Sequence, residues 1–87
     1  MSRNNSPLTL ADLPRLRRGR VLRVDGGGAL ADRLRELGFA PDTEVVFLRR
    51  APLGDPLLFR LRGTDLSLRR SEAARVVITL DEEPAPE

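Results

Sequence analysis

The chain has 87 residues, of which 40% are hydrophobic and 32% are charged, and these values predict one small globular domain with a thin core. It contains no Cys, His, Lys, Trp or Tyr, so zinc-finger and haem ligands, Ser-His and Cys-His nucleophiles and a P-loop lysine are excluded. The net charge is only +2, and the pI of about 10.9 is high because all 15 basic residues are arginine. We expect no enzyme and no catalytic, cofactor or metal site.

No stretch of the sequence approaches the roughly 20 apolar residues that a membrane span requires. The longest run of large apolar residues covers only positions 45–48. The polar opening at residues 1–7 does not resemble a signal peptide. We therefore expect a cytoplasmic protein that is peripheral to a membrane only through a partner.

The predicted domain occupies residues 8–80, between a disordered tail at residues 1–7 and an acidic tail with two prolines at residues 81–87. Near its start, three leucines recur at every third position and predict a short helical turn. These leucines are Leu10, Leu13 and Leu16. Residues 20–25 then have strand character, which ends at the glycines of positions 26–28.

Residues 29–37 form the one predicted full helix, because their leucines fall at i, i+4 and i+7 on a single stripe. The leucines of the stripe are Leu30, Leu34 and Leu37. Gly38 follows at the position where a left-handed residue commonly ends a helix. Phe39 is expected to fold back over the last turn.

After a turn at Pro41-Asp42, every pattern has a period of two. Residues 44–49 are apolar on both faces, which predicts a strand buried on both sides. The next strand places large apolar side chains on one face and arginines on the other. The apolar face carries Leu57, Phe59 and Leu61, and the other face carries Arg60 and Arg62.

A hairpin and a last strand complete the predicted elements. Residues 62–65 predict a two-residue turn of type II′ with Gly63 first, followed by a partner strand through Leu66 and Leu68. Ser71 is expected to start a single helical turn, and residues 76–80 alternate as a final strand. About five short strands, four of them without intervening helices, predict a small SH3-like barrel with the helix between the first and second strands.

The segment at residues 51–56, Ala-Pro-Leu-Gly-Asp-Pro, is the least ordinary connection in the sequence. Its two prolines stiffen it and cannot donate ladder hydrogen bonds, and Leu53 at its centre is predicted to be exposed. Either a rigid strand connection or a preordered apolar contact for a partner fits this pattern. As a partner-binding site, the segment would act together with two neighbouring arginines. The candidate residues are Arg49, Arg50, Pro52, Leu53, Gly54, Asp55 and Pro56.

Surface arginines offer an alternative function as a small-barrel nucleic-acid binder. The relevant side chains are Arg17, Arg18, Arg49, Arg50, Arg60, Arg62, Arg69 and Arg70. The three phenylalanines are the only aromatic residues and occupy core-like positions, so stacking partners for bases are scarce and we expect no nucleic acid. Asp55 and Asp65, both near turns, are a weaker candidate pair for a hard cation.

Several motifs, in order and spacing, resemble the FeoA family, ferrous iron transport protein A. They are Arg33-Leu34-x-Glu36-Leu37-Gly38-Phe39-x-Pro41, Ala51-Pro52-Leu53-Gly54-Asp55-Pro56, Arg62-Gly63, Leu66-Ser67-Leu68-Arg69 and Glu72-Ala73. The likeness covers nearly the whole predicted domain. One departure is Asp42, where the family usually has glycine, and this leaves either a type I turn or a left-handed aspartate.

The resemblance implies an SH3-like barrel and a small cytosolic accessory protein of bacterial ferrous iron uptake. Its implied partner is FeoB, the membrane permease with a cytosolic GTPase domain. Stimulation, inhibition and assembly of that transporter are all compatible with the resemblance, as are a monomer and an oligomer.

Overall fold

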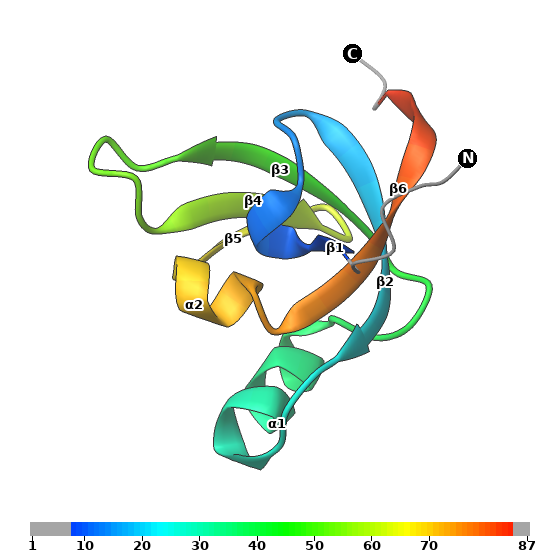
Figure 1. Ribbon diagram of the computed structural model, residues 1–87, viewed down its shortest axis with the longest axis vertical. Helices are drawn as coiled ribbons and strands as arrows, with labels where there is room; N and C mark the ends of the chain where they lie inside the picture. The colour runs from blue at the N-terminus through cyan, green and yellow to red at the C-terminus, as the bar shows by residue number, and fades with distance from the viewer. Residues whose placement is uncertain (1–7, 85–87) are drawn as a thin grey trace.

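The computed structural model describes residues 8–84 (Figure 1). Its elements in chain order are β1 (Leu8–Thr9), the 3-10 helix η1 (Leu10–Asp12), β2 (Arg17–Val24), α1 (Gly28–Leu37), β3 (Glu44–Arg50), β4 (Leu57–Leu61), β5 (Thr64–Leu68), α2 (Arg70–Ala73) and β6 (Val76–Pro84). The strands form one antiparallel sheet in the order β1-β6-β2-β3-β4-β5. This bent sheet is the predicted small SH3-like barrel.

The barrel has one strand more than the approximate count of five. The two-residue β1 pairs with Ile78 and Val77 of β6, so the main helix follows the second strand instead of the first. At the other end of the chain, β6 continues to Pro84, four residues beyond the predicted end of the domain at Leu80. The predicted tail at residues 1–7 and the last three residues of the tail at 81–87 lie outside the described part of the chain.

Helix α1 ends at the predicted glycine. Gly38 has φ 118°, its N–H donates to the carbonyl of Arg35, and the N–H of Phe39 donates to the carbonyl of Leu34. These two bonds form a Schellman motif that returns Phe39 to the core. The predicted stripe was partly wrong, because Ala31 and Leu34 are the buried helix residues and Leu37 is 41% exposed.

The structure decides between the two alternatives for the Pro41-Asp42 turn, in favour of the left-handed aspartate, and corrects the turn type of the hairpin. Asp42 takes φ 72° after Pro41, and the N–H of Thr43 donates to the carbonyl of Ala40, so this is a type II turn with a left-handed aspartate. In the β4–β5 hairpin, the turn residues are Arg62 and Gly63, both with positive φ, which makes a type I′ turn. The predicted type II′ turn therefore placed the two turn residues one position too far along the chain, at Gly63 and Thr64.

The hairpin register has a tertiary cause. Leu57, Phe59 and Leu61 are all buried on β4, and Leu61 lies opposite Thr64 in the ladder. Because a shift of one residue would move every side chain to the other face, burial fixes the turn and Arg62 adopts the left-handed conformation. The predicted faces of β4 are confirmed.

Three smaller predictions also need correction. The inner side chains of β3, Val45 and Phe47, are buried, but Val46 and Leu48 are only half-buried because the outer face of a single barrel meets solvent. Helix α2 begins one residue before Ser71, because the N–H of Arg70 already has an acceptor in Asp55 Oδ1 at 2.7 Å. Leu16 is exposed, so the buried part of the first leucine pattern ends at Leu13.

Candidate functional site

The loop between β3 and β4 projects from one side of the barrel, at the left of Figure 1. It is closed by two backbone hydrogen bonds, from Ala51 N–H to Pro56 O at 2.9 Å and from Gly54 N–H to Ala51 O at 2.8 Å. Leu53 lies at its tip and is 96% exposed. The predicted exposure of Leu53 is confirmed, and this apolar side chain is presented on a closed turn.

The loop is also tied to α2. Asp55 Oδ1 accepts the hydrogen bond from Arg70 N–H, and the Arg70 guanidinium donates to Gly54 O at 3.4 Å. The Asp55 carboxylate therefore braces the loop. The second carboxylate of the candidate cation pair, Asp65, accepts two hydrogen bonds from Arg60 at 2.7 and 3.1 Å.

Those bonds change the titration of the Arg60–Asp65 pair. Hydrogen bonding by Arg60 lowers the pKa of the Asp65 carboxyl, with a Coulombic contribution in the same direction. The same bond raises the pKa of Arg60. The two candidate cation ligands thus have different partners, Arg70 of α2 for Asp55 and Arg60 of β4 for Asp65. Within residues 8–80, no three Asp or Glu side chains are grouped closely enough to hold a metal ion.

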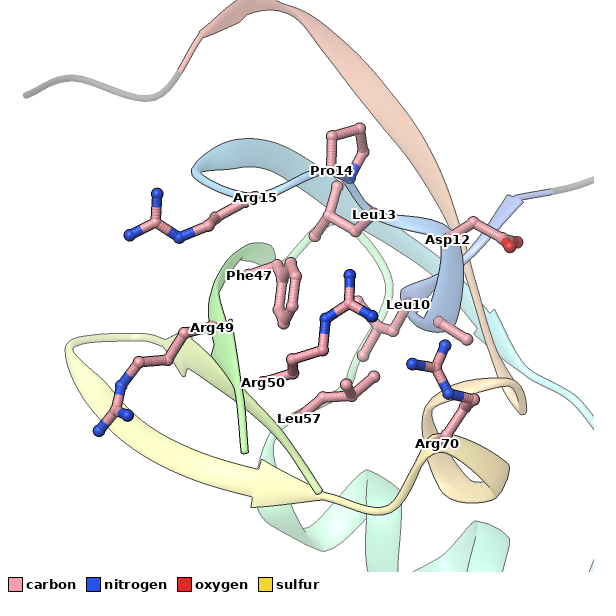
Figure 2. Close-up of a pocket in the computed structure, with 11 residues that line it drawn as sticks. Leu10, Asp12, Leu13, Pro14, Arg15, Phe47, Arg49, Arg50, Leu57 and Arg70 are labelled. Carbon is pink, nitrogen blue, oxygen red and sulfur yellow. The ribbon is translucent and has the colours of Figure 1, made fainter. Parts of the chain in front are cut away.

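A groove of about 480 Å³ opens beside this loop, between η1, the end of β3 and the start of β4 (Figure 2). Apolar side chains form much of its lining, and four arginines stand around it. The lining residues are Leu10, Ala11, Asp12, Leu13, Pro14, Arg15, Phe47, Arg49, Arg50, Leu57 and Arg70. Its volume falls within the range of about 300–1,000 Å³ that is usual for ligand pockets.

A β-bulge aims Arg50 at this groove. Phe47 pairs with Phe59, but Arg49 pairs with Leu58 and Arg50 with Leu57, so Leu48 is an extra residue in β3. Without the bulge, strand alternation would place Arg49 on the inner face and Arg50 on the outer face. With it, Arg50 shares the inner face with Leu57. In Figure 2 the Arg50 side chain crosses the groove, whereas that of Arg49 extends away from it.

The structure brings together only part of the predicted site. Arg49 and Arg50 line the groove, whereas Pro52, Leu53, Gly54, Asp55 and Pro56 lie in the adjacent loop and do not line it. The groove itself, including Arg15 and Phe47, was not predicted from the sequence. The recurring leucines at positions 10 and 13 were visible as a helical turn, but nothing in the local pattern placed them opposite β3.

Carboxylates pair with several surface arginines, among them Arg18 and Arg60 of the candidate nucleic-acid surface. Other ion pairs join Arg20 with Glu44 at 3.2 Å and Arg33 with Glu72 at 3.2 Å. All three phenylalanines are buried, and the rings of Phe47 and Phe59 lie 5.5 Å apart in the core. Within residues 8–80, therefore, no exposed aromatic ring is available to stack on a base.

A small barrel with an exposed apolar tip and a groove edged by arginines is the architecture of a binding domain. The family model described as the FeoA domain matches residues 8–80. The chain belongs to the FeoA family, and the resemblance in the sequence is confirmed. Within residues 8–84, no helix has both the length and the apolar character needed to cross a bilayer.

Solved FeoA structures show the same fold. FeoA from Stenotrophomonas maltophilia, solved with zinc and described as a prokaryotic SH3-domain protein, has 41% sequence identity and a TM-score of 0.73 over 82% of this chain and 88% of that chain. FeoA from Chlorobium tepidum has 33% identity and a TM-score of 0.77 over 84% of this chain and 70% of that chain.

A fusion protein of Fe(2+) transport protein A and the Fe(2+) transporter FeoB, from Porphyromonas gingivalis, is 35% identical over 60 residues. The match covers 69% of this chain and 7% of the fusion protein. This chain therefore spans only a small part of that relative.

Proposed function

We propose that this protein is a cytoplasmic, non-enzymatic accessory factor of bacterial ferrous iron uptake that binds the cytosolic region of a FeoB-like transporter. Membership of the FeoA family supports the role in iron transport. The Stenotrophomonas maltophilia relative is described as a candidate activating factor for bacterial ferrous iron transport. The Porphyromonas gingivalis fusion supports the choice of partner, because it joins both proteins in one chain.

The exposure of Leu53 is the main observation that supports this loop as the docking surface. Burying a leucine side chain in a partner contributes about 1.5–3 kcal/mol, and here the side chain is almost fully exposed beforehand. The loop is closed by its own backbone bonds and tied to α2 by Asp55, so little conformational entropy is lost on docking. Arg49 and Arg50 flank the loop and are available to acidic groups of the partner.

The test is affinity co-purification of the tagged protein from a membrane-inclusive lysate of the source cells. A salt concentration of about 0.15 M screens loose attraction between charges beyond roughly 8 Å. We expect the transporter to be recovered with the unaltered protein and lost with Leu53→Asp. The matched control is Leu22→Asp, because Leu22 is also an exposed leucine, at 46%, but lies on β2.

The possible outcomes test the proposed partner and the proposed docking surface separately. Recovery of the transporter with Leu53→Asp as efficiently as with the unaltered protein would exclude the loop as the docking site. Recovery of nucleic acid without a membrane protein would replace the proposed function by the alternative that rests on surface arginines. Circular dichroism of both variants checks that the barrel remains folded.

A further inference from the structure

The floor of the groove beside η1 is formed by side chains at the edge of the hydrophobic core. Leu10, Leu13, Phe47 and Leu57 belong to the hydrophobic core, and each also lines the opening. A ligand that fills this space gains most by placing apolar atoms against these side chains.

The charge around the groove is strongly positive. Four arginines and one aspartate line it. The side chain of Arg49 extends away from the opening, so the three remaining arginines and Asp12 give the groove a net charge of +2. The single carboxylate is Asp12, whose Oδ2 accepts hydrogen bonds from the N–H and the hydroxyl of Thr9 at 3.1 and 3.2 Å. In Figure 2 this carboxylate points away from Arg50. The groove therefore has cationic charge that its own carboxylate does not neutralise.

Arg50 is the cation most directly over the floor. The bulge at Leu48 turns it to the inner face, and Figure 2 shows its guanidinium extending between Phe47 and Leu10. Among the side chains of residues 8–80, Arg50 has no hydrogen-bond or ion-pair partner. A carboxylate placed there would make charge-assisted hydrogen bonds beside apolar surface, where they are stronger than in open water.

We propose that this groove binds an acidic peptide segment of another protein, in which one or two large apolar side chains are flanked by aspartate or glutamate. Charge complementarity argues for carboxylates, and the floor argues for the apolar anchors. The net positive charge opposes a second copy of the same groove, and the buried phenylalanines leave no stacking platform for nucleic acid. This site is distinct from the loop tip and does not depend on which protein carries the segment.

The test uses the full chain and a fluorescein-labelled synthetic peptide with leucines between aspartates, followed by fluorescence anisotropy. One matched peptide has serine in place of each leucine, and a second has lysine in place of each aspartate. We expect measurable binding only for the first peptide, weakening as salt rises from about 0.05 to 0.15 M. Amide chemical-shift changes should cluster in η1, the end of β3 and the start of α2.

The decisive variant is Arg50→Glu, with Arg62→Glu as the matched control. Both arginines are exposed, and each replacement changes the net charge equally, but Arg62 lies in the hairpin turn and not in the groove. We expect Arg50→Glu to weaken binding by about tenfold or more and Arg62→Glu by less than about twofold. Should Arg50→Glu reduce folding, Arg50→Gln removes the charge without reversal and is expected to weaken binding in the same direction.

Three results would overturn the proposal. The first is equal binding of the serine peptide, which would mean that charge alone is recognised. The second is equal loss with Arg50→Glu and Arg62→Glu, which would mean that the groove is not the site. The third is that a different ligand shifts the same amide signals. That ligand would be either an oligothymidylate that binds as tightly as the acidic peptide or a second copy of the protein in a concentration-dependent dimer. Because the assay contains no transporter, its failure leaves the loop experiment unaffected.

Discussion

Replacement of Gly38 by valine tests whether the end of α1 controls the stability of the barrel. Gly38 has φ 118°, and an L-residue in a left-handed conformation costs about 1–2 kcal/mol. A Cβ at this position would lie 3.1 Å from Leu61 Cδ2, closer than ordinary contact. Since overpacking adds about 1–3 kcal/mol, we expect a total loss of about 2–5 kcal/mol.

For a domain of this size, each kcal/mol shifts the melting temperature by about 4–8 °C. Gly38→Val should therefore lower the Tm by roughly 10 °C or more in thermal unfolding followed by circular dichroism. Gly27→Ser is the control, because Gly27 has an extended backbone, open space around its Cα and the N-cap position that serine favours. A Gly38→Val protein that melts within a degree or two of the unaltered protein would refute the importance of this helix end.

Two further predictions concern the core and the β4–β5 hairpin. Phe59→Ala, at a fully buried position, should reduce the free energy of unfolding, measured in urea, by about 3–5 kcal/mol. Leu37→Ala, at a partly exposed position, should reduce it by much less. Equal reductions for the two variants would contradict the assigned core. The carboxyl of Asp65 should titrate below its ordinary pKa of 3.8 by NMR, and Arg60→Gln should raise that pKa. Because the folded pKa is the lower one, the stabilisation by this pair is present above about pH 4 and is lost as the pH falls through the folded pKa. Identical titration of Asp65 in both proteins would exclude the hydrogen bond as the cause.

Local periodicity was sufficient to predict the principal helix and most of the strands. The spacing of Leu30 and Leu34 and the glycine at position 38 are properties of a few consecutive residues, and they determine a helix and its end without reference to the rest of the chain. The alternation in β4 likewise reports directly on which side chains are buried. The exposed tip at Leu53 followed from the two prolines that surround it.

Features that depend on a partner strand were not predictable in the same way. The type I′ turn at Arg62-Gly63 follows from the register that buries Phe59, and β1 exists only because β6 lies beside it. The groove is assembled from segments separated by many residues, at η1, the end of β3, the start of β4 and the start of α2. No local motif places these segments together, since their arrangement is a product of the whole sheet.

The different orientations of Arg49 and Arg50 show how the fold gives adjacent identical residues different environments. In the sequence they form a symmetrical pair beside the loop, and regular alternation would turn Arg49 inward. The extra residue at Leu48 reverses this, so Arg50 lies opposite Leu57 on the inner face and Arg49 lies opposite Leu58 on the outer face. One bulge therefore adds a cation to an apolar groove while leaving the second arginine beside the loop that carries Leu53. The proposed peptide site and the proposed transporter contact are thus adjacent surfaces of the same barrel that share Arg50, and they are tested by different variants.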